Sequence, residues 1–188
     1  MMKKSKRTLV ILLIVFLAIG SGFLINRLWN ALDPTPFIQQ YAEEYDVPVS
    51  LIHAVIEVES HFNPYATSSV GARGLMQMMP ATFEWLTGED HLGEHLPASL
   101  LYDSEVSIRY GVYYLRYLYD KFGSWDLVLA AYNGGEGNVA KWLQNPEYSD
   151  GKGNLTYIPF TETRNYVEKV KNAQKNYEEL QDRSEETA

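Results

Sequence analysis

The N-terminal part of this chain contains an uninterrupted apolar run that limits how the rest can be organised. Residues 8–25 contain no charged side chain, and the segment 1–7 before them carries four basic residues, Lys3, Lys4, Lys6 and Arg7. As a helix, this run would extend about 27 Å, just enough to span the hydrocarbon core of a membrane. Because basic flanks stay in the cytoplasm, we expect a single-pass transmembrane helix at 8–25, with the bulk of the chain on the extracytoplasmic side of the cell membrane.

A cleaved signal peptide is the alternative interpretation of the same run. The segment Ala18-Ile19-Gly20 has the small residues of a cleavage site, and cleavage there would give a secreted protein. The apolar run continues beyond this site as far as Ile25, which favours a retained anchor. A buried core helix is disfavoured because the segment has no polar face.

The charges are unevenly distributed along the chain. All 24 acidic residues follow residue 30, together with only 11 of the 16 basic residues, so residues 31–188 carry a net charge of −13. A part this acidic is unsuited to the phosphate backbone, so nucleic acid is not an expected partner. The chain also contains no cysteine, which excludes disulfides, thiolate metal sites and a cysteine nucleophile.

Proline, glycine and capping residues divide the rest of the chain into successive amphipathic helices. After a tether at residues 26–36, the pattern predicts a mainly α domain at 37–180 and a disordered polar tail at 181–188. Helices are expected at 37–45, 50–62, 80–86, 104–122, 125–132, 138–143 and 162–180. The segments 63–74, 87–97 and 145–159 are expected to be irregular, with a small β element near 75–78.

Glu59 lies on the apolar side of the second predicted helix. At about 100° per residue it falls some 20° from Ile52 and 40° from Val55, whereas Glu57 points away from it. Burial and the C-terminal end of the helix dipole both favour a neutral carboxyl, so we expect a raised pKa, which suits a general acid. Periodicity alone leaves open a purely structural glutamate that is satisfied by hydrogen bonds.

The sequence after Glu59 contains several short motifs. They are Asn63-Pro64, Val70-Gly71-Ala72, Gly74-Leu75-Met76-Gln77-Met78-Met79-Pro80, Ala131-Tyr132-Asn133-Gly134-Gly135 and Ile158-Pro159-Phe160-x-Glu162-Thr163-Arg164-x-Tyr166-Val167. In this order the motifs closely resemble the soluble lytic transglycosylase family over about residues 37–178. The resemblance implies a lysozyme-like helical catalytic domain of the goose type.

The resemblance also implies roles for individual residues. By position, Glu59 matches the sole catalytic acid of the family, and Ser68 matches a hydroxyl near it. The remaining matches are to residues that line the glycan groove or contact the substrate: Gln77, Met79, Tyr132, Asn133 and Glu162. No metal and no cofactor is implied, and the expected partners are peptidoglycan glycan strands and, through the N-terminal helix, the cytoplasmic membrane.

The activity implied by the resemblance is that of a murein lytic transglycosylase. Glu59 would protonate the β-1,4 glycosidic oxygen between N-acetylmuramic acid and N-acetylglucosamine and then deprotonate the 6-hydroxyl of the muramic acid, giving 1,6-anhydro ends without water. No Asp or Glu occurs between Glu59 and Glu84, so no second carboxylate is close in sequence. A lysozyme-type hydrolase remains an alternative, with Glu136 or Glu162 as its second carboxylate. The other alternative is a catalytically inactive module that binds the cell wall.

Two further features are interpreted as structural. His91 and His95 are spaced like metal ligands, but they lack the adjacent glutamate of a zinc peptidase motif, so no metal site is expected. The tyrosines of the predicted helix 104–122 are expected to pack in the core or at its edge, while Trp85 and Trp142 are left open between core packing and sugar stacking.

Overall fold

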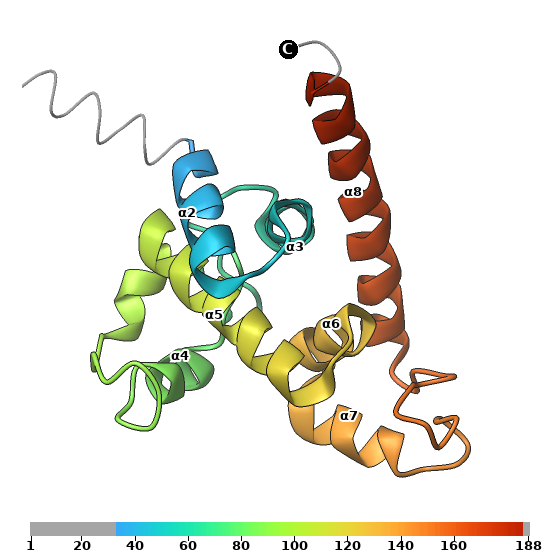
Figure 1. The fold of residues 1–188 in the computed structure, drawn as a ribbon. Helices are drawn as coiled ribbons and strands as arrows, with labels where there is room; N and C mark the ends of the chain where they lie inside the picture. The colour runs from blue at the N-terminus through green and yellow to red at the C-terminus, as the bar shows by residue number, and fades with distance from the viewer. Residues whose placement is uncertain (1–32, 186–188) are drawn as a thin grey trace, which may run out of the picture. The chain divides into compact units, whose positions relative to one another are not determined.

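A computed structural model of the chain describes residues 33–185, and helices are the only regular elements among them (Figure 1). The elements are α2 (Thr35–Tyr45), α3 (Val49–Ser60), α4 (Pro80–Leu86), the 3-10 helix η1 (Ala98–Tyr102), α5 (Ser104–Phe122), α6 (Trp125–Gly134), α7 (Glu136–Leu143) and α8 (Thr161–Glu185). The predicted transmembrane helix at 8–25 lies outside the described residues. Between residues 33 and 185, no helix is long and apolar enough to cross a membrane.

The predicted mainly α character is confirmed, and the differences lie at the ends of elements. Helix α2 begins at Thr35, inside the predicted tether, because Pro36 is compatible with a first helical turn. Helix α8 continues to Glu185, so the expectation of a disordered tail is wrong for 181–185. This segment contains no glycine or proline to end the helix, and Arg183 donates from Nε to the carbonyl of Glu179 at 3.0 Å.

The small β element expected near 75–78 does not form a strand within the described part of the chain. Two isolated antiparallel bridges occur instead, between Thr67 and Arg73 and between Arg73 and Met78. Gln77 has a positive φ of 46°, which interrupts the extended backbone that a strand would need. The segment 63–79 is therefore a compact loop fastened by single bridges.

Helix α5 is the central element, and α2, α4, α6 and η1 all pack against it. It begins as predicted, since the side chain of Asp103 accepts a hydrogen bond from the backbone of Val106, and it ends at Gly123 in the left-handed region. Gly111 lets the loop after α3 approach α5 closely. A Cβ at this position would overlap the side chain of Met76, which is fully buried.

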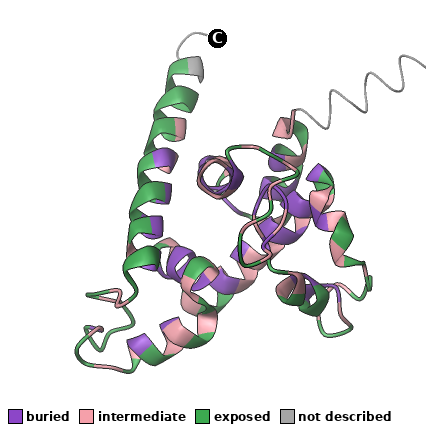
Figure 2. Cartoon of the chain, turned by 180° about the vertical axis from the view of Figure 1, so that it is seen from behind, coloured by how far each residue is buried: buried purple, intermediate pink, exposed green. Residues whose placement is uncertain are grey.

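Helix α8 covers the side of the domain that is formed by α3 and α6. Its buried residues, Thr163, Tyr166, Val167, Val170 and Ala173, lie on the face toward these helices, and the outer face is exposed (Figure 2). Helix α6 ends close to the start of α8: a Cβ on Gly134 would lie 2.9 Å from Oγ1 of Thr163. This contact brings the end of α6 and the first turns of α8 together.

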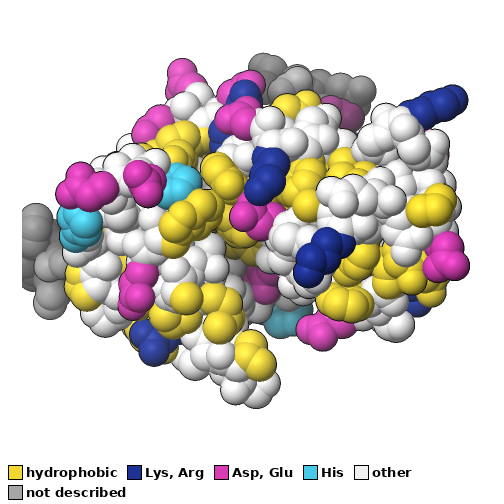
Figure 3. Space-filling model, turned by 90° about the horizontal axis from the view of Figure 1, so that it is seen from below, with side chains coloured by type: hydrophobic (Ala, Val, Ile, Leu, Met, Phe, Trp, Pro, Cys, Tyr) yellow, Lys and Arg dark blue, Asp and Glu magenta, His cyan; other side chains and the backbone are white. Residues whose placement is uncertain are grey.

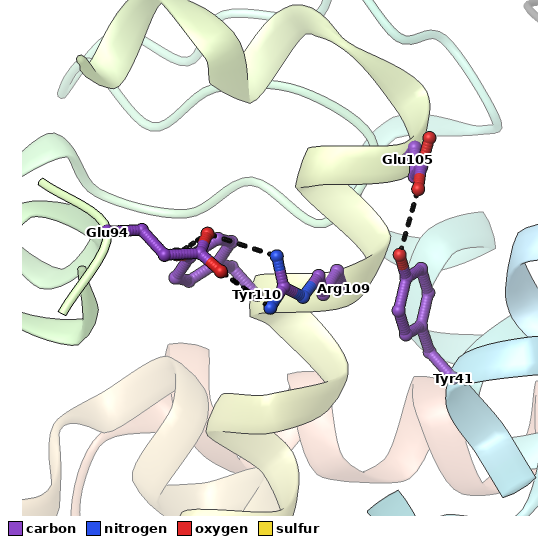
Figure 4. Close-up of polar contacts among 5 residues, drawn as sticks. All are labelled: Tyr41, Glu94, Glu105, Arg109 and Tyr110. Carbon is purple, nitrogen blue, oxygen red and sulfur yellow. Dashed lines mark hydrogen bonds and ion pairs between the residues drawn. The ribbon is translucent and has the colours of Figure 1, made fainter. Parts of the chain in front are cut away.

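The irregular segment 87–97 is fastened to α5 by a partly exposed ion pair. Arg109 donates from both terminal nitrogens to Glu94, at 3.0 and 2.7 Å, and the hydroxyl of Tyr110 donates to the same carboxylate at 2.8 Å (Figure 4). One turn earlier on α5, Glu105 accepts a hydrogen bond from Tyr41 of α2 at 3.0 Å. The segment is irregular in its backbone but held in a defined place.

Candidate active site

Glu59 lies in the last turn of α3, where its side chain is half-buried. Burial raises the pKa of this carboxyl from 4.5 to about 7, and an interaction with the hydroxyl of Tyr166 opposes the rise. The predicted direction of the shift is thus confirmed, with burial as its main cause. A carboxyl of this kind is partly protonated near neutral pH and can donate a proton.

The second group of the site is Tyr166, which lies on α8 and interacts with Glu59 through its hydroxyl. Its side chain is 6% exposed, and its buried hydroxyl makes no hydrogen bond of regular geometry within residues 33–185. The hydroxyl is nevertheless close enough to Glu59 to interact with its carboxylate. Burial raises the pKa of Tyr166, and the charge of Glu59 raises it further, so the phenol stays neutral and can act as a donor.

Tyr132, near the end of α6, is the third group of the site. Burial is the main cause of the raised pKa of Tyr132, and the charge of Glu59 raises this pKa further. The second effect indicates that the two side chains are near each other. The hydroxyl of Tyr132 donates to the carbonyl of Met76 at 2.7 Å. The hydroxyl of Tyr132 is therefore bonded to the loop after α3, within range of the charge of Glu59.

The loop 63–79 is held against the end of α3 by short polar contacts. The hydroxyl of Ser60, next to Glu59, donates to the carbonyl of Leu75 at 2.7 Å. His61 and Phe62, which follow, both adopt positive φ, at 49° and 61°. Backbone of this kind is strained in residues other than glycine, and it turns the chain sharply away from the acid.

The hydrogen bonds of the Ser68 and Gln77 side chains are made inside this loop. Oγ of Ser68 accepts a hydrogen bond from the backbone of Ala72 at 3.0 Å. Nε2 of Gln77 donates to the carbonyls of Gly74 and Ala66, at 2.9 and 3.1 Å. Both side chains thus stabilise the loop beside Glu59, and the hydroxyl hydrogen of Ser68 and Oε1 of Gln77 are the groups they could offer to a ligand.

Three other residues named from the resemblance have exposed side chains on different elements. Met79, 41% exposed, precedes α4, Asn133 lies on α6, and Glu162 lies in the first turn of α8. Among residues 33–185, none of the three forms a hydrogen bond or an ion pair with Glu59. These three residues therefore lie at the surface, whereas Tyr132 interacts electrostatically with Glu59.

No second carboxylate influences Glu59 within the described part of the chain. Burial and Tyr166 are the two causes of its pKa shift. Of the two candidates for a second carboxylate, Glu136 is held in an ion pair with Lys121 at 2.9 Å, and Glu162 is exposed. The arrangement favours chemistry with one acidic group.

The spacing of His91 and His95 does not bring them to a common ligand position. Nδ1 of His91 lies 3.1 Å from the hydroxyl of Tyr113, while Nε2 of His95 pairs with Glu89 at 3.0 Å. Among residues 33–185 there is no group of three or more acidic, histidine or cysteine side chains suited to a metal ion.

A cavity separate from Glu59 lies on another part of the domain. It has a volume of about 580 Å³ and lies between the start of α6, the segment 154–158 and α8. Its charged side chains include Lys171, which pairs with Asp126 at 2.7 Å, and Arg164, which donates to the carbonyl of Ile158 at 2.7 Å. Neither Glu59 nor Tyr132 lines it.

Sequence reasoning named no role for Tyr166, although it lies in one of the motifs. The contact between positions 59 and 166 depends on how α8 packs against α3, and no local pattern reports that packing. The available signal was its place at helical spacing from Val170 on a predicted amphipathic helix, which indicates a buried hydroxyl.

Comparison with known proteins identifies the family. Residues 36–154 match the family model described as Transglycosylase SLT domain, which is more than half of the chain, and the chain belongs to this family. The matched range contains Glu59 and Tyr132 and ends before α8.

Among similar curated proteins, the soluble lytic murein transglycosylase of Escherichia coli (strain K12) is 35% identical over 153 residues, which are 77% of this chain and 24% of that protein. The membrane-bound lytic murein transglycosylase C of Glaesserella parasuis serovar 5 (strain SH0165) is 32% identical over 167 residues, 76% of this chain and 45% of that protein. The chain thus spans about a quarter of the soluble relative and less than half of the membrane-bound one.

Similar solved structures agree with this assignment. The 70 kDa soluble lytic transglycosylase from Escherichia coli superimposes with a TM-score of 0.70 and 34% identity, covering 78% of this chain and 24% of that chain. The structure of an inactive glutamate-to-glutamine mutant of the lytic transglycosylase Slt from Pseudomonas aeruginosa gives a TM-score of 0.69 and 33% identity over the same shares. The predicted lysozyme-like transglycosylase fold is therefore confirmed.

Proposed function

We propose that this protein is a peptidoglycan lytic transglycosylase in which Glu59 is the single acid and base. The observation that carries the proposal is the half-buried Glu59 carboxyl. Its pKa is raised to about 7, and within the described residues no second carboxylate contributes to this shift. The family supports it, since relatives of the same domain are named lytic murein transglycosylases. One of the similar structures is an inactive glutamate-to-glutamine mutant, which shows that a glutamate matters in that relative.

The reaction proceeds in two proton transfers on the same carboxyl. Glu59 gives its proton to the glycosidic oxygen between N-acetylmuramic acid and N-acetylglucosamine, and the bond from that oxygen to the anomeric carbon breaks. The Glu59 carboxylate then takes the proton of the muramic acid 6-hydroxyl, whose oxygen bonds to the anomeric carbon. The acid is regenerated, no water is consumed, and the product has a 1,6-anhydro end.

The neighbouring tyrosines fit these two steps. Tyr166 can donate a hydrogen bond to the Glu59 carboxylate after the first transfer, which stabilises the charged form. Tyr132 donates its hydroxyl hydrogen to the carbonyl of Met76 and lies within range of the charge of Glu59. Ser68, Gln77, Met79, Asn133 and Glu162 are proposed as substrate contacts from the family resemblance.

We further propose that the domain acts at the outer side of the cytoplasmic membrane, anchored by residues 8–25. The proposal rests on the basic flank and apolar run of the sequence and on the membrane-bound name of one relative. Fractionation of cells that express the full chain, followed by protease treatment of spheroplasts, tests both anchoring and orientation. Release of the domain into the medium would instead indicate a cleaved signal.

Mass spectrometry of the products tests the proposed reaction. The full chain and its Glu59→Gln variant are each incubated with purified peptidoglycan, beside a known lytic enzyme. We expect muropeptides with 1,6-anhydromuramic acid ends from the wild type and none from the variant. Products with reducing ends, heavier by one water, would identify a hydrolase. Binding to peptidoglycan without products from either protein would identify a wall-binding module.

A further inference from the structure

Trp85 is a large side chain at the surface that is nonetheless held in one orientation. It lies in α4 and is 40% exposed. Three rings contact the indole nearly at right angles: His91 at 4.1 Å between centroids, Tyr117 at 5.1 Å and Tyr114 at 6.4 Å. Because these contacts come from α5 and from the segment 87–97, the indole is fixed from more than one side.

The rings around Trp85 connect to the candidate active site. Tyr114 and Tyr117 of α5 are stacked, with an interplanar angle of 14°. Tyr114 also lies 5.5 Å from the ring of Tyr132, which is the tyrosine next to Glu59. Two ring-to-ring steps therefore lead from the tyrosine beside the acid to the exposed indole.

The segment that carries His91 is positioned by contacts outside this aromatic series. Its ring nitrogen Nδ1 lies 3.1 Å from the hydroxyl of Tyr113, and the segment is tied to α5 by Glu94 and Arg109. The aromatic surface is thus arranged before any ligand arrives, which lowers the entropy lost on binding.

Polar groups border the aromatic series on α5 and α7. Nζ of Lys121 lies 5.8 Å from the ring of Tyr117 and pairs with Glu136 at 2.9 Å. In the view from below, hydrophobic side chains gather across the middle of the face, with charged side chains interspersed (Figure 3). Flat apolar rings bordered by hydrogen-bonding groups are suited to a sugar, which has apolar C–H faces and polar edges.

We propose that Trp85, with Tyr117 and His91 beside it, forms an outer subsite that binds one pyranose ring of the glycan strand, beyond the sugars joined at the cleaved bond. The inference rests on the proposed function, because it takes the glycan strand as the ligand. In this proposal, Trp85 makes the protein bind long strands more tightly than short ones, because only a strand that reaches past Tyr114 can contact the indole.

Binding of model glycans to an inactive protein tests the subsite apart from catalysis. The full chain with Glu59→Gln, purified in detergent, is titrated calorimetrically with the hexamer and the trimer of β-1,4-linked N-acetylglucosamine. Adding Trp85→Ala should weaken hexamer binding about tenfold, the loss typical of a buried aromatic anchor, and change trimer binding by less than about twofold. Trp85→Phe, which keeps a ring in place, should retain most of the hexamer affinity and guards against a general loss of structure.

Tyr157→Ala is the matched control. Tyr157 is 49% exposed and lies outside the aromatic series, so its removal should leave both affinities unchanged. Equal hexamer affinity with and without Trp85, while the parent protein binds the hexamer, would overturn the outer subsite and leave the proposed function intact. A parent protein that binds neither the oligomers nor purified glycan strands would overturn both.

Discussion

Replacing Glu59 by glutamine should stabilise the protein at alkaline pH, because the native state holds this carboxyl proton more tightly than the unfolded chain does. The pKa rises from 4.5 to about 7 on folding, and each unit corresponds to about 1.36 kcal/mol. The contribution of Glu59 to stability is therefore fully present below about pH 4.5 and is lost as the pH rises through about 7. The loss amounts to about 3 kcal/mol at most, since the side chain is only half-buried.

Glutamine has nearly the same shape and no proton to lose, so the Glu59→Gln protein lacks this pH dependence. The difference in unfolding free energy between variant and wild type should grow from about pH 5 to about pH 8.5. At the upper end it should reach up to about 3 kcal/mol, or on the order of 6–12 °C in melting temperature. Denaturant unfolding of both proteins across this range measures the difference directly, and the contributions of all other groups cancel.

The same carboxylate-to-amide change on another part of α3 provides the control. Glu57→Gln makes the change two residues earlier, at a side chain that is not among the buried residues of α3, and it reports what the chemical change does by itself. A difference between Glu59→Gln and wild type that stays constant from about pH 5 to about pH 8.5 would refute the argument. So would an equal pH dependence for Glu57→Gln. Either result would mean that burial does not hold Glu59 protonated.

Further predictions concern the acid, its tyrosine neighbour and the ion pair that fastens the irregular segment. Digestion of purified peptidoglycan should decline as the pH rises through about 7, because Glu59 must be protonated to act, and a rate that instead rises from pH 6 to 8 would contradict this role. Tyr166→Phe removes a hydroxyl that lowers the pKa of Glu59, so the alkaline decline in a pH–rate profile should move to higher pH, with a melting temperature no lower than that of the wild type. Arg109→Leu leaves Glu94 without its bidentate partner and should cost about 1 kcal/mol, seen as a melting temperature about 2–4 °C lower; an unchanged value would show that the pair does not fasten the segment.

The helix boundaries that sequence reasoning placed correctly are those with a chemical signal at the boundary. Pro80 marks the start of α4, and Asp103 and Gly123 flank α5, so both helices could be predicted with their ends. Helix α8 has no such signal after Leu180 and continues to Glu185 through polar and charged residues. The β element near 75–78 was predicted wrongly because the positive φ of Gln77 is set by the contacts of the loop, which no local pattern reports.

The candidate site also contains features that a local pattern predicts and features that depend on tertiary packing. Helical periodicity placed Glu59 on the buried side of its helix, because that position depends on residues within two turns, and burial on that side gives the pKa shift its direction. The approach of Tyr166 to Glu59 and of Tyr114 to Tyr132 depends on packing between distant segments. Tertiary packing of this kind is not encoded in any short stretch of sequence.

The order of the elements along the chain has a consequence for biosynthesis. Glu59 lies near the beginning of the domain, whereas Tyr166 lies on α8, the last helix. During synthesis, α3 and α6 emerge first, and their apolar faces stay uncovered until α8 joins them. The acid consequently lacks both its buried surroundings and its tyrosine partner until α8 has been synthesised, so the centre around Glu59 is assembled only after the other helices of the domain have been made.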